Sequence, residues 1–167
     1  MPNHVEALQC LCNLRLCQDR LDDAVESLER ALLQWLPKKK ELYNSLLGND
    51  VDLEDERSAK LFNDLPSPEI QRQAAQHCIE VGKLDTAIEI LELCLMDEEE
   101  DFQTWHMIAI AHFLSKNYSE ASEAIENAEQ VHFAIDEVND KGSCASIHPL
   151  TRHFGISFSL LVVMKKC

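Results

Sequence analysis

Residues 84–94, LDTAIEILELC, and residues 118–128, YSEASEAIENA, follow one pattern at a distance of 34 positions. In each stretch a large residue stands three positions before an alanine, Ala87 or Ala121, and an aliphatic residue follows four positions after it. A small residue comes three positions further on. A fixed period of this length is the signature of a repeat protein, so the chain is predicted to be built from units of 34 residues.

The same pattern occurs near the start of the chain, in the string RLDDAVESLERAL, where Ala24 holds the alanine position. The chain therefore divides into three predicted units, at residues 1–38, 68–101 and 102–135. Turn-forming pairs stand before the second half of each unit, so each is expected to hold two amphipathic helices. Alanine lets two helices cross closely, and stacked neighbours bury faces that one unit could not bury alone. The predicted fold class is an all-α solenoid of helix-turn-helix units.

Composition agrees with this class. The 167 residues are 46% hydrophobic and include only four glycines and five prolines, which favours one folded domain of long helices. Thirty acidic residues against fifteen basic ones give a net charge of -15. This charge repels nucleic acid and anionic membranes and attracts basic proteins, although it could also serve solubility alone. Because of this charge, direct binding to nucleic acid is not expected. No run is long and apolar enough to span a bilayer, so no membrane segment is expected either.

The seven cysteines are odd in number, lack the spacing of a disulfide framework and follow no secretory signal. They indicate a reducing, intracellular compartment. Cys10, Cys12 and Cys17 with His4 could be imagined as zinc ligands, but on one helix Cys10 and Cys12 point about 200° apart. We therefore interpret them as small buried residues. The sequence has no nucleophile motif, phosphate-binding loop or metal signature, so no catalytic residue, metal or cofactor is expected and the chain is not predicted to be an enzyme.

Residues 39–67 interrupt the period as an acidic insertion, whose opening KKKELYNSLL is expected to prolong the preceding helix. Ser67 as cap and Pro68 in the first turn are expected to restart the helical pattern. Residues 136–167 lack a helical period and are predicted to form an irregular tail. This tail could be strand-like, disordered, or the product of a retained intron or an erroneous gene model. Pro2 stands where a preceding repeat would end, so further repeats are expected upstream of the first residue.

The units resemble the tetratricopeptide repeat, which implies a right-handed superhelix. The third unit fits best, with His112 and Phe133 as departures, and the second is weaker at Gln71 and Ala74. In such a fold the first helices line the concave side, which predicts a polar, acidic and partly apolar groove. Asn13 stands alone, with Gln9 where heat-shock cochaperones place a lysine, so that group is disfavoured. The predicted partner-binding residues are Glu6, Gln9, Asn13, Glu69, Arg72, Gln76, Glu80, Gln103, His106, Ile110 and Phe113.

A closer resemblance, over about residues 3–130, is to the acidic tetratricopeptide chaperone dedicated to ribosomal protein L-4 of the large subunit. It is carried by ALQCLCNLRLCQDRLDDAVESLERALLQW, by the charged insertion that follows, and by the last unit, which opens after an acidic run with Trp105. Members of this chaperone family are eukaryotic, work in the cytoplasm and nucleus, and hold a long basic loop of the ribosomal protein that is their client. The resemblance thus implies a basic ribosomal client, with the oligomeric state left open. The alternative is a passive interaction module within a larger eukaryotic complex.

Overall fold

The computed structural model describes residues 4–47, 64–98 and 101–140. These residues form six α-helices and no strand, which confirms the predicted all-α class. None of these described helices is long and apolar enough to cross a membrane. Side chains are described only as far as residue 45 in the second helix and residue 132 in the last. The helices are α1 (Val5–Cys17), α2 (Leu21–Leu47), α4 (Pro68–Glu80), α5 (Leu84–Asp97), α6 (Phe102–Leu114) and α7 (Tyr118–Asp140).

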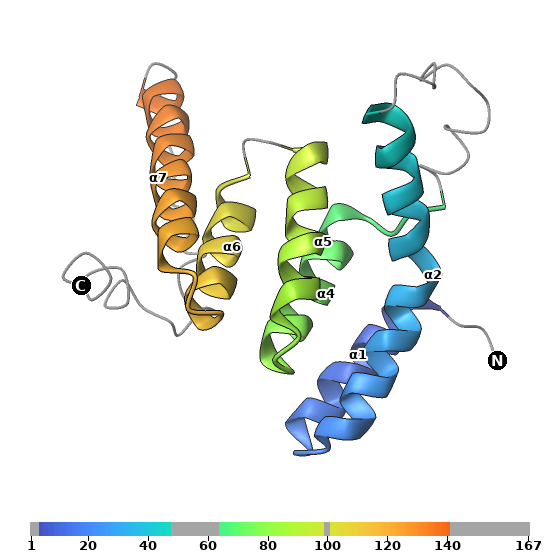
Figure 1. The fold of residues 1–167 in the computed structure, drawn as a ribbon. Helices are drawn as coiled ribbons and strands as arrows, with labels where there is room; N and C mark the ends of the chain where they lie inside the picture. The colour runs from blue at the N-terminus through green and yellow to red at the C-terminus, as the bar shows by residue number, and fades with distance from the viewer. Residues whose placement is uncertain (1–3, 48–63, 99–100, 141–167) are drawn as a thin grey trace.

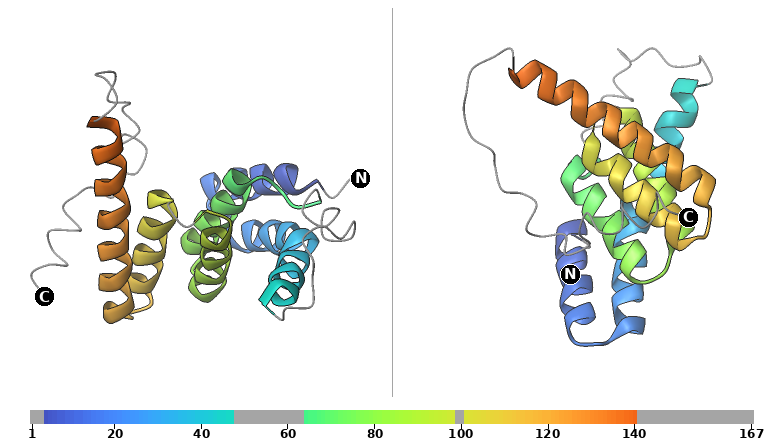
Figure 2. Two further views of the ribbon diagram at one scale, coloured as in Figure 1. Left: turned by 90° about the horizontal axis from the view of Figure 1, so that it is seen from above. Right: turned by 90° about the vertical axis from the view of Figure 1, so that its left-hand side faces the viewer.

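The helices pair as α1 with α2, α4 with α5 and α6 with α7, and the three hairpins stand side by side (Figure 1). Neighbouring hairpins also touch, since α5 packs against α6, α1 against α4 and α2 against α5. Viewed from above, α1 and α4 lie along one side of the array and α2 and α5 along the other (Figure 2). The units therefore stack as a solenoid, each covering a face of its neighbour.

The turn inside each unit has the same backbone conformation. Asp19, Gly82 and Lys116 each have a positive φ, at 57°, 79° and 64°, and the latter two are one 34-residue period apart. In each unit the next residue donates its N–H to a carbonyl five residues back, which is the Schellman bond that satisfies a helix end. These bonds are Arg20 to Arg15 (2.9 Å), Lys83 to Cys78 (2.8 Å) and Asn117 to His112 (2.9 Å).

The alanines of the repeat pattern are packed inside the array of helices. Ala24, Ala87 and Ala121 are each fully buried. Because alanine adds little beyond its Cβ, helix backbones can approach there and larger side chains fill the space beside them. This outcome confirms the packing role predicted for these alanines. The neighbouring core residues include Leu28, Trp35, Cys78, Ile90, Leu91, Met107, Ile108 and Ile125.

Two helices run past the predicted ends of their units, and the first of these extensions was expected. Helix α2 runs past residue 38 to Leu47, so the KKKELYNSLL segment prolongs it as expected, despite Pro37 inside the helix. Helix α7 runs past residue 135 to Asp140. Ser67 holds the N-cap position of α4, but its side chain makes no capping hydrogen bond, so Pro68 alone of the two predicted signals acts there. The rest of the insertion, residues 48–63, and the tail from residue 141 lie outside the described residues.

A buried polar network holds the extension of α2 against the second unit. Lys39 is fully buried, and its Nζ donates to Asp97 Oδ2 at 2.6 Å and to the amide oxygen of Gln71. The hydroxyl of Tyr43 donates to the other oxygen of Asp97. Gln71 in turn donates its amide N–H to the carbonyl of Pro66 at 2.7 Å. Burial and the hydrogen bond to Asp97 raise the pKa of Tyr43, which keeps its hydroxyl a donor.

Candidate protein-binding site

The predicted groove residues lie on α1, α4 and α6, the first helices of the three units, where the side chains differ in exposure. Those on α6 are polar, aromatic or apolar, and the sequence of α6 contains no carboxylate. The acidic members of the set are therefore confined to α1 and α4. Glu6, Asn13, Glu69, Glu80 and Gln103 are exposed; Arg72, Gln76, His106, Ile110 and Phe113 are half-buried; and Gln9 is buried.

The one arginine of the predicted set is neutralised by carboxylates. Arg72 Nη2 lies 2.8 Å from Glu69 Oε2, and its Nη1 lies 2.5 Å from Asp101 Oδ2. The hydrogen bond from Arg72 is the main cause that lowers the pKa of Glu69. Burial alone would raise the pKa of Asp101, but hydrogen bonds from Thr104 and Arg72 outweigh it and lower that pKa. Because Arg72 is neutralised by these two carboxylates, Glu6 and Glu80 give the face of α1 and α4 a negative potential.

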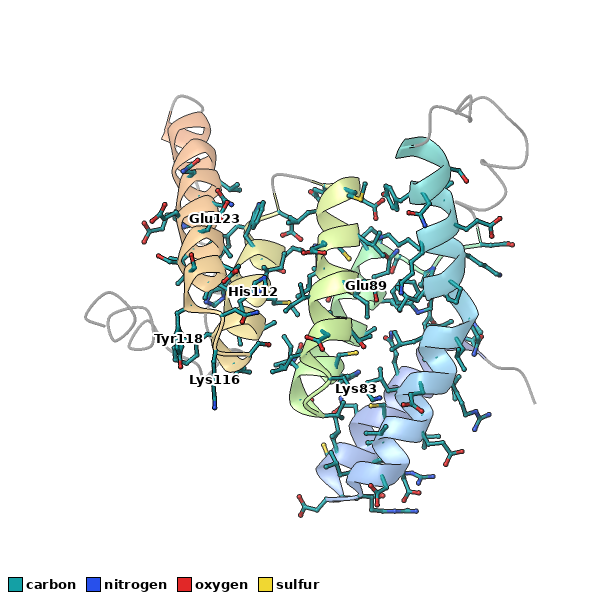
Figure 3. The ribbon with its side chains drawn as sticks, viewed as in Figure 1. Lys83, Glu89, His112, Lys116, Tyr118 and Glu123 are labelled. Carbon is teal, nitrogen blue, oxygen red and sulfur yellow. The ribbon has the colours of Figure 1, made fainter. Side chains whose placement is uncertain are left out.

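Other basic side chains of the described helices are also engaged with acids. Lys83 reaches from the tip of the α4–α5 hairpin to Glu29 of α2 at 2.7 Å, and Figure 3 shows Lys83 at that tip. Each such pair neutralises one cation and one carboxylate, so it leaves the net negative charge of the chain unchanged. The further pairs are Lys40 with Glu89 (2.5 Å), Arg15 with Asp23 (3.1 Å) and Arg20 with Asp23 (2.6 Å).

A hollow of about 160 Å³ lies between α1 and α4. Sequence reasoning placed two of its residues, Glu6 and Gln9, in the partner-binding set. It missed the others because they become neighbours only when α1 packs on α4. A usable signal exists on α4, since positions 70, 73 and 77 share one helical face at spacings of three and four. The missed lining residues are Cys10, Ile70, Gln73 and His77.

Gln9 requires a correction, because it was predicted to contact a partner from an open groove surface. Its side chain is only 3% exposed, and its Nε2 donates to the backbone carbonyl of Ile70 at 2.9 Å. The amide thus joins α1 to α4 beside the hollow. Its Oε1 is buried, and so is Nδ1 of His77, and neither atom has a hydrogen-bond partner among the described residues. Burial lowers the pKa of His77 although Glu80 opposes this, so the ring is neutral at neutral pH.

The third unit presents aromatic rings on the predicted face. His106 stacks on Phe102, with ring centroids 6.1 Å apart and planes 2° from parallel, and burial lowers the pKa of His106. Phe113 meets Tyr118 edge-on at 5.7 Å between centroids. Side chains of this kind contribute contact area to a partner rather than charge.

The cysteines of α1 do not share one environment. Cys12 is buried as predicted, and burial followed by the charge of Glu80 raises its pKa to about 11. Cys10 and Cys17 are exposed, so the interpretation of all three as buried small residues is wrong for these two. They differ because α1 turns one face to α2 and presents the other to solvent. Across the described residues no group of three histidine, cysteine or acidic side chains is placed to hold a metal ion.

Three stacked helix-turn-helix units, with a period of 34 residues between the second and third, define a helical solenoid of the tetratricopeptide type. Stacked repeats of this kind form extended concave surfaces that can be used for binding. No protein-family model matches the chain, and no curated protein matches it by sequence. Among solved structures, the chain is similar to the crystal structure of MamA protein, with 17% identity, a TM-score of 0.42, and coverage of 88% of this chain and 81% of that one. The fold assignment rests on the chain's own helices and turns.

Proposed function

We propose that this chain is a protein-binding scaffold that acts as a dedicated chaperone, shielding a basic ribosomal protein during assembly of the large ribosomal subunit. It would work in the cytoplasm and nucleus, without cofactor and without catalysing a reaction. The general part of the proposal is supported by the fold, because a solenoid offers a continuous surface to an extended segment. The observation that favours a basic client is the charge of -15, combined with the pairing of cations such as Arg72 and Lys83 with carboxylates.

The mechanism follows from the distribution of side chains on the first helices. Glu6 and Glu80 attract a Lys/Arg-rich segment and speed its association, and this steering weakens as salt screens the charges. Ile110 and Phe113 on α6 are half-buried and can contact the apolar parts of the same segment. A client held this way has its positive charges covered until it reaches its site, which prevents premature contact with nucleic acid.

Recovery of bound proteins from a eukaryotic lysate tests the proposal. The full chain should retain a basic protein of the large ribosomal subunit, identified by mass spectrometry. With the purified client, the complex should have one-to-one stoichiometry and should weaken as salt rises from about 50 to 200 mM, where the screening length falls to well under 10 Å. If no basic ribosomal protein is recovered, the chaperone proposal fails. Recovery of the subunits of another complex, with no such client, would favour the passive interaction module instead.

Charge reversal on the first helices sharpens this test. Glu6→Lys combined with Glu80→Lys should weaken client binding about tenfold or more, because both side chains are exposed on α1 and α4. Glu69→Lys is less clean, since it also breaks the ion pair with Arg72. Glu26→Lys combined with Glu92→Lys makes the same change in net charge on exposed positions of α2 and α5. Equal loss in both double variants would mean that overall charge, and not this face, governs binding.

A further inference from the structure

We propose that the hollow between α1 and α4 is a receptor for an arginine side chain of an extended protein partner. This inference rests on the proposed function in one respect, namely that the partner is basic. It adds a defined place on the scaffold and a preference for arginine over lysine. The hollow is lined by Glu6, Gln9, Cys10, Ile70, Gln73 and His77.

Gln9, which lines the hollow, carries a hydrogen-bond acceptor without a donor. The amide of Gln9 has a fixed orientation, because its Nε2 donates to the Ile70 carbonyl and that oxygen can only accept. Oε1 of Gln9 is consequently the unpaired atom, and it is buried. An unsatisfied buried acceptor costs free energy that a donor from outside would recover. A group with N–H donors that enters the hollow can pair with this oxygen once the Gln9 side chain turns slightly toward it.

His77 adds a second polar atom to the same hollow. Its Nδ1 is buried without a partner among the described residues, and the side chain is 9% exposed. Because the ring is neutral, one of its nitrogens is available as an acceptor and the ring adds no positive charge. Two separated acceptors on residues that line one hollow match a ligand that has donors spread over a flat group.

The rim and walls also match a guanidinium. Glu6 at the rim is 60% exposed and supplies negative charge, and Ile70 supplies an apolar wall for the flat face of the group. Arginine has five N–H donors in a planar fork and is weakly hydrated, whereas a lysine ammonium is a compact, strongly hydrated charge with three donors. The neighbouring cation Arg72 does not oppose this, because it is paired with Glu69 and Asp101.

Two synthetic peptides of equal length and charge test the preference, one alternating arginine with glycine and the other lysine with glycine. Binding to the full chain is measured by calorimetry at about 50 mM salt. The arginine peptide should bind about tenfold more tightly, which is the size expected for charge-assisted hydrogen bonds to buried acceptors. On its addition, the NMR signals of the Gln9 side-chain amide and the His77 ring should shift.

Cys10 and Cys17 provide a matched pair of variants, since both are exposed on α1 and only Cys10 lines the hollow. Cys10→Trp should fill the hollow and abolish the preference for arginine, and Cys17→Trp should keep it. Glu6→Gln, which leaves the helix packing untouched, should weaken the arginine peptide more than Glu26→Gln does. Circular dichroism checks that each variant retains its helices.

The outcomes separate the receptor from the general proposal. If both peptides bind with equal affinity, or if the preference survives Cys10→Trp, the receptor is overturned and a basic client remains supported. Binding without any shift at Gln9 and His77 likewise overturns the receptor, because the hollow then holds only water. If neither peptide binds, the proposed attraction for a basic client fails together with the receptor.

Discussion

Replacing Lys39 by methionine should destabilise the protein by about 2–3 kcal/mol. Lys39 is fully buried, and its ammonium lies 2.6 Å from Asp97 Oδ2 and also donates to Gln71. Methionine has a similar length and can occupy the same space, so the change removes charge and hydrogen bonds with little loss of volume. Asp97 and the Gln71 oxygen would be left without this donor.

The magnitude follows from how buried the partner is. Removing one member of a fully buried ion pair costs about 3–5 kcal/mol, because the other charge stays desolvated. The side chain of Asp97 is 22% exposed and keeps the hydroxyl of Tyr43 as a donor, so water relieves part of this cost. The neighbouring pair of Lys40 with Glu89 is 40% and 44% exposed, so Lys40→Met should cost at most about 1 kcal/mol.

Urea denaturation followed by circular dichroism at 222 nm, the usual helix band, measures both variants, with Lys40→Met as the control for charge. A double-mutant cycle of Lys39→Met with Asp97→Asn should give a coupling energy above about 1 kcal/mol, because the two side chains share one network. Equal losses for Lys39→Met and Lys40→Met, or a coupling near zero, would refute the reasoning. The pair would then not be formed in solution, and the extension of α2 would be held by apolar contacts alone.

Three further predictions concern the turns and the histidines. Lys116→Gly should raise the midpoint of thermal unfolding by a few degrees. It removes left-handed strain of about 1–2 kcal/mol, which exceeds the cost of about 0.5–1 kcal/mol from the greater chain entropy of the unfolded state. Asn117→Gly, at a residue outside that conformation, should lower the midpoint. Gly82→Ala should lower the free energy of unfolding, measured by urea denaturation, by about 1 kcal/mol. No atom lies within 4 Å of the added Cβ, so the cost comes from the φ of +79° alone. Unchanged stability would contradict this strain. Burial lowers the pKa of His77 and of His106, so protonation favours the unfolded chain. The free energy of unfolding should therefore decline as pH falls below about 6.5. Replacing both histidines by glutamine should flatten the dependence of stability on pH between about pH 7 and 5.

The repeat could be predicted from sequence because its signals are local and tied to packing. Ala24, Ala87 and Ala121 hold the alanine position of the repeat pattern, and each is fully buried in the structure. The turn residues are also periodic, but the residue in the left-handed conformation at position 116 is a lysine, so no glycine indicates it in the sequence. Figure 3 shows that the side chain of this lysine extends away from the tip of the α6–α7 hairpin, so the strain there lies in the backbone alone. A local pattern thus predicts the element and its packing face, and strain at a turn is revealed only by the backbone.

The base of the candidate site could not be predicted in the same way. Gln9 and Ile70 are 61 positions apart, and their contact depends on how α1 lies against α4 across an insertion. On a helical wheel Gln9 falls with the groove residues, but its amide donates a hydrogen bond to the backbone carbonyl of Ile70 on the other helix. Helical periodicity states which face a side chain occupies. It does not state which long-range polar partner will bury that side chain.

Two departures from the repeat pattern explain each other and connect the fold to the site. Gln71 is a polar residue where the repeat favours a large apolar one, and Lys39 is a charge inside the packed extension of α2; together they form one network. That network is hydrogen-bonded to α4 at Gln71, and Gln9 of α1 donates a hydrogen bond to the adjacent carbonyl of Ile70. The position of α4, and hence the shape of the hollow, is therefore set from two sides. Although Lys39 does not line the hollow, Lys39→Met should reduce the preference for the arginine peptide as well as stability, because α4 would lose one of its two polar anchors.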